Sequence, residues 1–496
     1  MRITNKMMTN NALYNINNNK NLLSNLEQQY STGKKITKPS DDPIVAVRAL
    51  KFRTNLTELN QYYEKNIPDA LAWMDVTESA LNTVNDIITS MNSYCNQGAN
   101  DHPTADDRDA IATNLEELKG QIYQEGNTNY AGRYVFSGYK TDTSLVFNEA
   151  VNNLKYTITE PLQPESMDRI SKVINEVDLS KYDPEEDWEN DMPKKVETYR
   201  LKLSYNNIAG DIQSFSYKDK DGNIKEPKVV TKSVLDNDAY EAEEEVIHFI
   251  PETGELIFDE DMYETLSKST EISVDYVKDE FEINDLRPEH YFDCKVIDTE
   301  KIVEDEDGNP IPIEYTKKDQ QIQYEVNFNQ KLTINTQGSD AFTTGICRMV
   351  DEIVNAVNDV KDVESAIKEV EKKLEDTSIS PKERTKLEEI QEQLDAELAL
   401  KTGVMTEAFQ RGITITEQQQ DIINIAVADL GGRYNRLQLT ESRLSDQQVD
   451  FEDLLSKNED ADLVDIIIRY SSAETVYNSS LSAASKLVQT SLLDFL

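Results

Sequence analysis

The chain is poor in the residues that do acid–base and metal chemistry in proteins. Its 496 residues include three histidines and three cysteines, at positions His102, His248, His290, Cys95, Cys294 and Cys347. Histidine is the commonest general base and metal ligand, and closely spaced cysteines mark zinc sites. None of the six lies in such a pattern, and no P-loop, GxGxxG, HExxH or GxSxG sequence occurs. We therefore predict no enzyme activity, no cofactor and no metal site.

Two acidic stretches, 219–223 and 305–309, resemble part of a calcium-binding loop. An EF-hand loop needs an oxygen ligand at its first position. Tyr217 holds that position in the first stretch and Val303 in the second. Both stretches lie between runs typical of strands, so we predict β-hairpin turns instead.

The charge balance excludes several classes of partner. There are 94 acidic and 51 basic residues, which leaves a formal net charge of −43. Nucleic acids and anionic lipid surfaces both attract clustered Lys and Arg, so we expect neither as a partner. No apolar run reaches the ~18 residues of a membrane span, and the Asn-rich N-terminus has no apolar signal-peptide core. We expect no membrane segment and no cleaved signal peptide.

The spacing of apolar residues divides the chain into three zones: helical, then strand-like from about residue 145 to 340, then helical again. This predicts an elongated, multi-domain α+β protein whose terminal helices pair into a coiled-coil or bundle rod. We assign residues 1–60 with 437–496 to a terminal helical assembly domain, and residues 61–145 with 341–436 to a helical rod with a hairpin near 360–400. Residues 146–340 form the acidic, β-rich inserted outer domain.

Both ends of the chain carry apolar stripes at helical spacing. Such a stripe needs a partner helix to cover it. The ends also differ in charge, with nine basic and four acidic residues in 1–60 against four and eleven in 437–496. We therefore predict that the ends pair and form the assembly interface, through Ile16, Leu22, Leu23, Leu26, Tyr30, Tyr477, Leu481, Ala484, Val488, Leu492 and Phe495.

Capping residues predict where helices begin and end. Gly33 is the expected end of the first helix. Ser40 is the expected N-cap of the second, whose apolar face should contain Val47, Leu50, Leu56 and Leu59. Ser380 and Pro381 are the expected N-cap and first residue of the second helix of the hairpin.

Strands are predicted where apolar and polar residues alternate. The runs are Tyr199, Leu201, Leu203, Tyr205; Ile272, Val274, Tyr276; and Ile322, Tyr324, Val326, Phe328. Residues 181–310 hold 37 acidic and 15 basic side chains, so we expect a strongly solvated outer surface.

Two segments of the first 143 residues and a set of short runs in the last 64 residues resemble the flagellin superfamily. The first, 33–50, includes Gly33, Lys34, Pro39, Ser40, Asp41, Asp42, Pro43 and Arg48, and its KPSDDP form is closer to the hook-associated branch than to filament subunits. The second, 132–143, includes Phe136, Gly138 and Lys140. Runs at 433–437, 459–463 and 491–496 complete the resemblance, which leaves the insert and the hairpin uncovered.

The resemblance implies a bacterial protein that leaves the cell unfolded through the flagellar type III export apparatus. It implies a location in the extracellular flagellum, at the hook–filament junction, where copies assemble as a homo-oligomeric ring. The implied neighbours are another hook-associated protein and flagellin, and a cytosolic export chaperone binds the C-terminal segment before export. In this reading the chain is a structural adaptor.

Two alternatives remain. The chain could be the filament subunit itself, which shares the terminal pattern and polymerises into long filaments. The acidic insert could also be a surface-displayed binding domain for carbohydrate or another cell surface, although no aromatic cluster marks a site.

Overall fold

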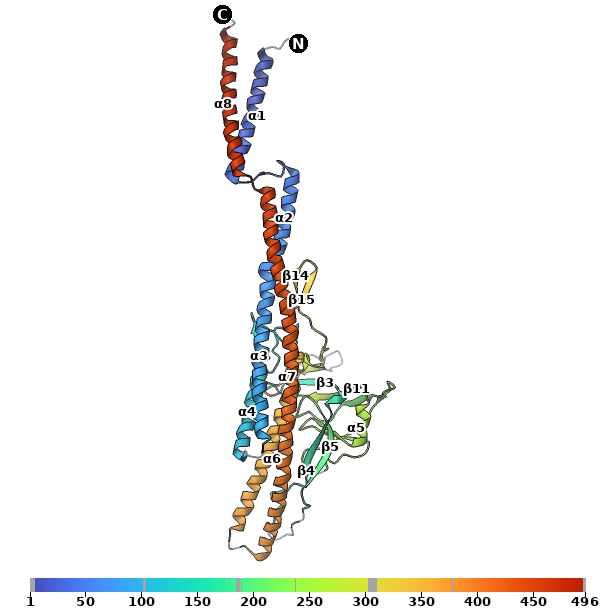
Figure 1. The fold of residues 1–496 in the computed structure, drawn as a ribbon. Coiled ribbons are helices and arrows are strands. Elements are labelled where there is room, and N and C mark those ends of the chain that lie inside the picture. The colour runs from blue at the N-terminus through green and yellow to red at the C-terminus, as the bar shows by residue number, and fades with distance from the viewer. Residues whose placement is uncertain are drawn as a thin grey trace. The chain divides into compact units, whose positions relative to one another are not determined.

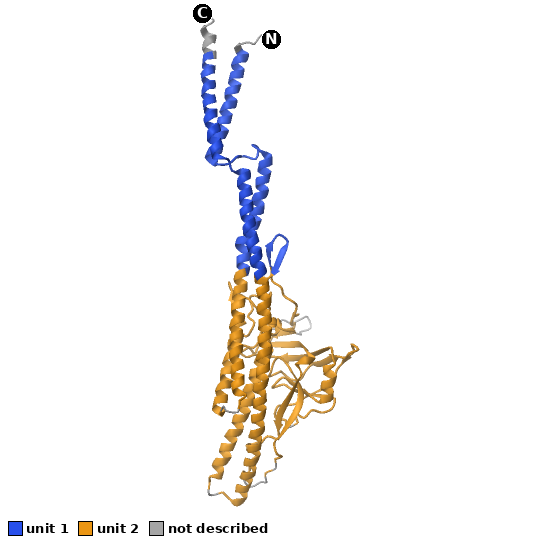
Figure 2. Ribbon diagram, viewed as in Figure 1, with its two compact units in different colours: residues 1–70, 324–332, 435–496 blue, residues 71–323, 333–434 orange. Residues whose placement is uncertain are grey.

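The computed structural model describes residues 5–100, 104–183, 188, 190–236, 238–301, 310–376 and 379–493. Helices form both ends of this part of the chain and strands its middle (Figure 1), so the predicted α+β organisation is confirmed. Contacts divide the chain into two units, residues 1–70, 324–332 and 435–496, and residues 71–323 and 333–434 (Figure 2). None of the helices in the described residues has both the length and the apolar character needed to span a membrane.

The first unit consists mainly of paired helices. α1 (Asn5–Thr32) packs along α8 (Leu463–Leu493), and α2 (Pro43–Gln61) runs beside the last part of α7 (Pro381–Glu459) (Figure 1). A π-helical turn, Tyr62–Asn66, connects α2 to α3 (Ile67–Gly98). The strands β14 (Gln323–Asn327) and β15 (Gln330–Thr333) form a two-stranded sheet, held to the start of α3 by a hydrogen bond from Asn66 Nδ2 to the Glu325 carbonyl (2.8 Å).

The second unit contains a helical bundle of α3, α4 (Ala105–Glu125), α6 (Thr344–Leu374) and α7. α4 begins with a capping box, in which the side chains and backbone N–H groups of Thr104 and Asp107 bond reciprocally. Gly412 lets α7 approach closely, since a Cβ there would lie 2.9 Å from Cys95 Sγ and 3.0 Å from Ile353 Cδ1. The predicted core residue Trp73 is 1% exposed.

The insert is built on two sheets of the described residues. The five-stranded sheet has the order β4-β5-β10-β9-β8 and the six-stranded sheet the order β13-β12-β3-β11-β6-β7. Neighbouring strands are antiparallel except β8 and β9, which are parallel. Apolar residues of both sheets share one core, which includes Leu201, Phe249 and Phe258 from the first and Ile158, Ile272 and Val274 from the second.

The short strands β1 (Asn129–Tyr130) and β2 (Arg133–Tyr134) pair before the insert begins. The strands and the helix of the insert are β3 (Leu154–Leu162), β4 (Asp168–Ile174), β5 (Lys194–Lys202), β6 (Ser214–Lys218), β7 (Ile224–Lys225), β8 (Lys228–Thr231), β9 (Val246–Ile250), β10 (Glu255–Phe258), α5 (Glu260–Ser267), β11 (Glu271–Lys278), β12 (Asp293–Asp298) and β13 (Ile313–Tyr315).

Several local predictions are confirmed. Gly33 follows α1 with a φ of +67°, and Glu383 N–H bonds to Ser380 Oγ (3.2 Å) where α7 begins at Pro381. Residues 219–223 form the turn between β6 and β7, in which one oxygen of the Asp219 carboxylate accepts from the N–H groups of Asp221 and Asn223, both at 2.9 Å. The second acidic turn, 305–309, lies outside the described residues.

Other predictions need correction. The N-cap of α2 is Asp42 and not Ser40, because the Asp42 carboxylate accepts from the backbone of Ile44 and Val45. The second hairpin helix does not end near residue 400: it is the first part of α7, which extends to Glu459 and is 79 residues long in total. The run at 199–205 is a strand only as far as Lys202, where β5 ends. The 322–328 run ends as a strand at Asn327, and Phe328 is 75% exposed.

Candidate assembly interface

The pairing of α1 with α8 buries a narrow seam. Leu26 is 3% and Ala473 is 8% exposed. Asn19 Nδ2 donates to Ser480 Oγ across the pair (3.0 Å). Four of the predicted stripe residues are half-buried in this seam or beside it, namely Ile16, Leu23, Tyr477 and Ala484. The two ends of the chain therefore cover part of each other's stripe.

Three further stripe residues are open to solvent. Leu22, Tyr30 and Leu481 are 46%, 55% and 42% exposed. The sequence reasoning missed further exposed apolar residues on the same two helices, although their helical spacing was visible: Met7, Met8, Leu13, Tyr14, Leu463, Val464, Ile467, Ile468 and Val476. The side chains of Val488 and Leu492 and all of Phe495 lie outside the described residues.

A tight turn after α1 joins the two helix pairs. The left-handed backbone of Gly33 allows its carbonyl to accept from Ala461 N–H (2.9 Å), while Lys35 N–H donates to the Glu459 carbonyl (2.7 Å). These bonds form an antiparallel bridge between Lys34 and Asp460. The segment after α1 is thereby fixed to the segment between α7 and α8.

Ion pairs reinforce this turn. The Lys34 ammonium bonds to the Asp460 carboxylate and lies 3.5 Å from Glu459, whose side chain also receives Arg53 at 2.6 Å. The hydrogen bond from Lys34 lowers the pKa of Asp460, and the same bond raises the pKa of Lys34. Because Lys34 and Asp460 are both about half exposed, the pair fixes geometry more than it adds stability.

The KPSDDP segment is a structured turn. The Asp41 carboxylate accepts from Lys38 N–H (2.9 Å) and Thr37 N–H (3.2 Å), and these backbone bonds lower its pKa. Asp42 then caps α2, and Pro43 occupies the first helical position, where no N–H donor is required. Pro39, Ser40 and Arg48 are exposed around this turn.

The second motif lies in the other unit, and its central residues 135–138 are buried. Phe136 is 1% exposed and packs edge-on against Phe342, with ring centroids 4.9 Å apart. Gly138 has a φ of +62°, and a Cβ there would meet Gln320 Oε1 at 2.2 Å. The Lys140 ammonium lies over the ring of Tyr315, 3.3 Å from its centroid. Within this unit the motif therefore supports packing.

The α2–α7 pair has small residues at its contact. Ala46, Ala49 and Leu59 are 5 to 7% exposed. Asn458 Nδ2 donates to the Val45 carbonyl (3.1 Å) at one end of the pair, and Gln448 Nε2 donates to Asn60 Oδ1 (3.2 Å) at the other. The predicted apolar face of α2 is therefore wrong in part, since Val47 and Leu50 point outward with 54% and 60% exposure.

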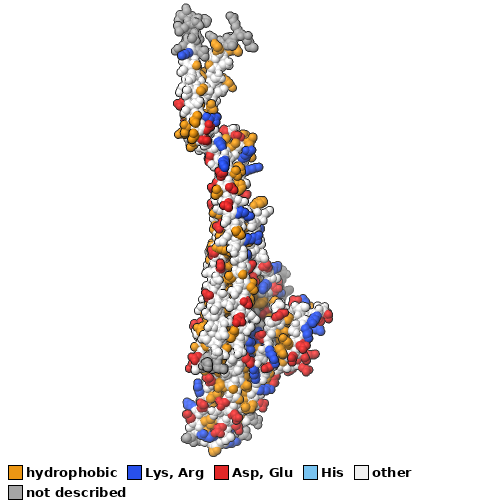
Figure 3. All heavy atoms as spheres, in the orientation of Figure 1, with side chains coloured by type: hydrophobic (Ala, Val, Ile, Leu, Met, Phe, Trp, Pro, Cys, Tyr) orange, Lys and Arg blue, Asp and Glu red, His pale blue; other side chains and the backbone are white. Residues whose placement is uncertain are grey.

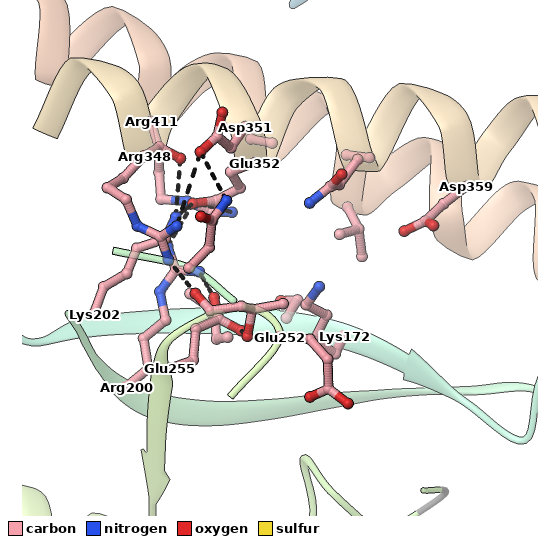
Figure 4. A pocket seen from close by; sticks show the side chains of 18 residues that line it. Lys172, Arg200, Lys202, Glu252, Glu255, Arg348, Asp351, Glu352, Asp359 and Arg411 are labelled. Carbon is pink, nitrogen blue, oxygen red and sulfur yellow. Dashed lines mark hydrogen bonds and ion pairs between the residues drawn. The ribbon is translucent and has the colours of Figure 1, made fainter. Parts of the chain in front are cut away.

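A buried ionic cluster fastens the five-stranded sheet to α6 and α7 (Figure 4). Glu352 of α6 accepts from Arg200 (2.7 Å) and Lys202 (2.9 Å) of β5 and from Arg411 Nε of α7 (3.1 Å). Burial alone would raise the pKa of Glu352, but the charges of Arg200, Lys202 and Arg411 outweigh it and hold that pKa well below its usual range. Burial lowers the pKa of Lys202 to about 8 against the opposing charge of Glu352. The cluster therefore joins β5, α6 and α7 through ion pairs between their side chains.

The described histidines and the three cysteines have structural roles. His248 bonds through Nδ1 to the Ala239 carbonyl and His290 through Nε2 to the Ser144 carbonyl, both at 3.1 Å. Burial raises the pKa of each cysteine thiol to about 12, so all three stay protonated near neutral pH. Among the described residues no three His, Cys, Asp or Glu side chains gather as metal ligands. His102 lies outside the described residues.

Comparisons with known proteins agree with the first two motifs. Residues 3–141 match the family model described as the bacterial flagellin N-terminal helical region, so the resemblance is confirmed for this part of the chain. Over 145 residues the chain is 33% identical to flagellar hook-associated protein 3 of Salmonella typhimurium, an alignment that covers 29% of this chain and 45% of that protein. The flagellin of Clostridium tyrobutyricum is 33% identical over 128 residues, covering 26% and 34% of the two chains.

The chain thus spans less than half the length of these curated relatives. Among solved structures, flagellar hook associated protein-3 from Legionella pneumophila aligns with 82% of this chain and 98% of its own, at 12% identity and a TM-score of 0.30. The C-terminal part of the resemblance, in 433–496, stays a prediction.

Proposed function

We propose that the chain is a structural adaptor of the bacterial flagellum that acts at the hook–filament junction by contacts between subunits and not by catalysis. One observation carries the proposal. The terminal helices pair with each other, yet they leave apolar residues such as Tyr14, Ile468 and Leu481 exposed by 42% or more. Extended apolar surfaces on a water-soluble helix pair are typical of protein contact sites.

The sequence relatives support the same proposal. Residues 3–141 match the flagellin N-terminal family model, and a stretch of 145 residues is similar to a protein named for its association with the flagellar hook. We infer that the chain forms a homo-oligomeric ring, with flagellin and another hook-associated protein as neighbours. We also infer that a cytosolic chaperone keeps the C-terminal segment unassembled before export, and that export into the extracellular flagellum uses no cleaved signal.

The domain organisation follows from this role. The terminal helices, residues 1–60 and 437–496, form the assembly domain. The helical rod (61–145 and 341–436) supports the acidic insert (146–340), which faces outward. We infer that the exposed stripe residues, such as Leu22, Tyr30 and Leu481, and the exposed part of the KPSDDP turn contact neighbouring subunits.

Seeding of isolated flagellar hooks tests the proposal. The purified chain is added to hooks, and the product is imaged by electron microscopy. A short cap limited to the hook tip is the expected result.

The filament subunit is the second candidate, favoured by the similarity to flagellin from Clostridium tyrobutyricum. Long filaments in the same experiment would establish it. Failure to bind hooks would instead favour the surface-displayed binding domain, which a glycan array with the full chain would examine.

A further inference from the structure

The face of α2 that points away from α7 is both apolar and basic. Ile44, Val47 and Leu50 are 66%, 54% and 60% exposed. Arg48 and Lys51 are exposed between them. At 100° per residue, Ile44, Val47, Arg48 and Lys51 lie on the side away from Ala46 and Ala49, which pack on α7. Leu50 lies at the edge of that side. We call this set the outer face of α2.

The face of α7 that points away from α2 is apolar and acidic. Leu439, Val449 and Leu454 are 74%, 63% and 45% exposed. Asp446, Asp450 and Asp453 are exposed on the same side, opposite the buried Leu437 and Leu444. We call this set the outer face of α7.

Most charged side chains of the two outer faces have no ion-pair partner in the described part of their own chain. Within the described part of the chain, Arg48 and Lys51 form no ion pair, nor do Asp446 and Asp450, whereas Asp453 pairs with Lys457 one turn along. Residues 43–61 hold three basic and one acidic side chain, and residues 439–460 hold two basic and seven acidic ones. Figure 3 shows basic side chains over α2 and acidic ones over the neighbouring part of α7.

We propose that the outer face of α2 in one copy docks on the outer face of α7 in the next copy. The apolar residues supply the buried area, and the opposite charges set which faces meet. The two faces lie on opposite sides of one helix pair, so every docked copy still presents a free face of each kind. Such a head-to-tail contact repeats and produces a ring or a helical array. The inference rests on the proposed function, because it names the partner that covers part of the assembly domain.

Charge reversal on each face tests this contact in the full chain. The basic-face variant is Arg48→Glu with Lys51→Glu, and the acidic-face variant is Asp446→Lys with Asp450→Lys. Two changes on each face make the test independent of the register at which the faces meet. The measurement is the association constant between copies, from sedimentation velocity at low salt, together with the amount of protein retained on isolated hooks.

Each variant alone should self-associate roughly tenfold more weakly, because attraction across the contact becomes repulsion. An equimolar mixture of the two variants should recover wild-type association, since each basic face then meets a matching acidic one. A chain that carries all four changes should recover it as well. The control Lys225→Glu with Lys228→Glu reverses two exposed charges of the insert and should behave as wild type.

Wild-type association by both variants, or no recovery in the mixture and the four-change chain, would overturn the contact. Circular dichroism of each variant shows that the helices are intact. If the wild-type chain did not bind hooks, the proposed function would be overturned instead. The self-association measurements would still show whether the outer faces of α2 and α7 dock on each other.

Discussion

Arg200 of β5 and Glu352 of α6 lie 152 residues apart in the sequence and form an ion pair with an Nη2 to Oε2 distance of 2.7 Å. Their side chains are 3% and 14% exposed. Glu352 also receives Lys202 and Arg411, so one carboxylate compensates cations from the sheet and from α7. A buried charge is tolerated only when it is paired, and this requirement makes the cluster a sensitive point of the second unit.

Replacement of Glu352 by Gln should destabilise the second unit strongly. The amide keeps the size of the side chain but leaves the buried Arg200 and the half-buried Lys202 and Arg411 without their shared carboxylate. We expect a loss of about 3 kcal/mol in the free energy of unfolding, measured by urea titration. The control is Glu371→Gln, an exposed residue of the same helix that should change stability little. Equal stability of the two variants would mean that the cluster is dispensable.

Lys202→Met should make stability depend less on pH. The pKa of Lys202 is lowered by burial to about 8 in the folded chain, from 10.5. The unfolded chain therefore binds more protons between these values, and Lys202 makes the free energy of unfolding rise with pH in that window. Below pH 8 the wild type bears the full burial cost, so the variant should be more stable there by about 3 kcal/mol, the worth of a shift of this size.

The check is a set of urea titrations of both proteins from pH 7 to pH 10. The advantage of the variant should shrink as the pH rises above 8. A difference that stays constant across this range would contradict the assignment of the pH dependence to Lys202.

Replacement by alanine should change the stability in opposite directions at two glycines of α7. At Gly412 a Cβ would meet Cys95 Sγ at 2.9 Å and Met349 Sδ at 3.3 Å, whereas at Gly403 nothing lies within 4 Å. Gly412→Ala should therefore cost about 1 to 3 kcal/mol through overpacking. Gly403→Ala should add about 0.5 to 1 kcal/mol through helix propensity. Thermal unfolding of the two variants beside the wild type measures both, and a stabilised Gly412→Ala would show that α3 and α6 can move apart freely.

Leu481→Asp should prevent incorporation at the hook tip without unfolding the insert. Leu481 is 42% exposed on α8, and a partner that covers it would have to desolvate the new carboxylate. Ser482→Asp places the same charge on the next, exposed residue and should assemble normally. Hook seeding measures assembly, and near-ultraviolet circular dichroism monitors the fold of the insert. Normal assembly of Leu481→Asp would exclude this part of the stripe from the interface.

The sequence alone determined the features whose energetics are local. The end of α1 at Gly33, the start of α7 at Pro381 and the turn at 219–223 depend on backbone preferences and on bonds between residues up to four positions apart. The α+β class follows equally from the period of the apolar pattern. The motif at 33–50 indicates the similarity to flagellin proteins by its sequence alone.

Only the tertiary structure decided which residues meet across the chain. Val47 turned outward because the small Ala46 and Ala49 let α7 approach the other face of α2. The pairing of Arg200 with Glu352 has no signature in the sequence, since a buried charge must be compensated but nothing local specifies by which residue.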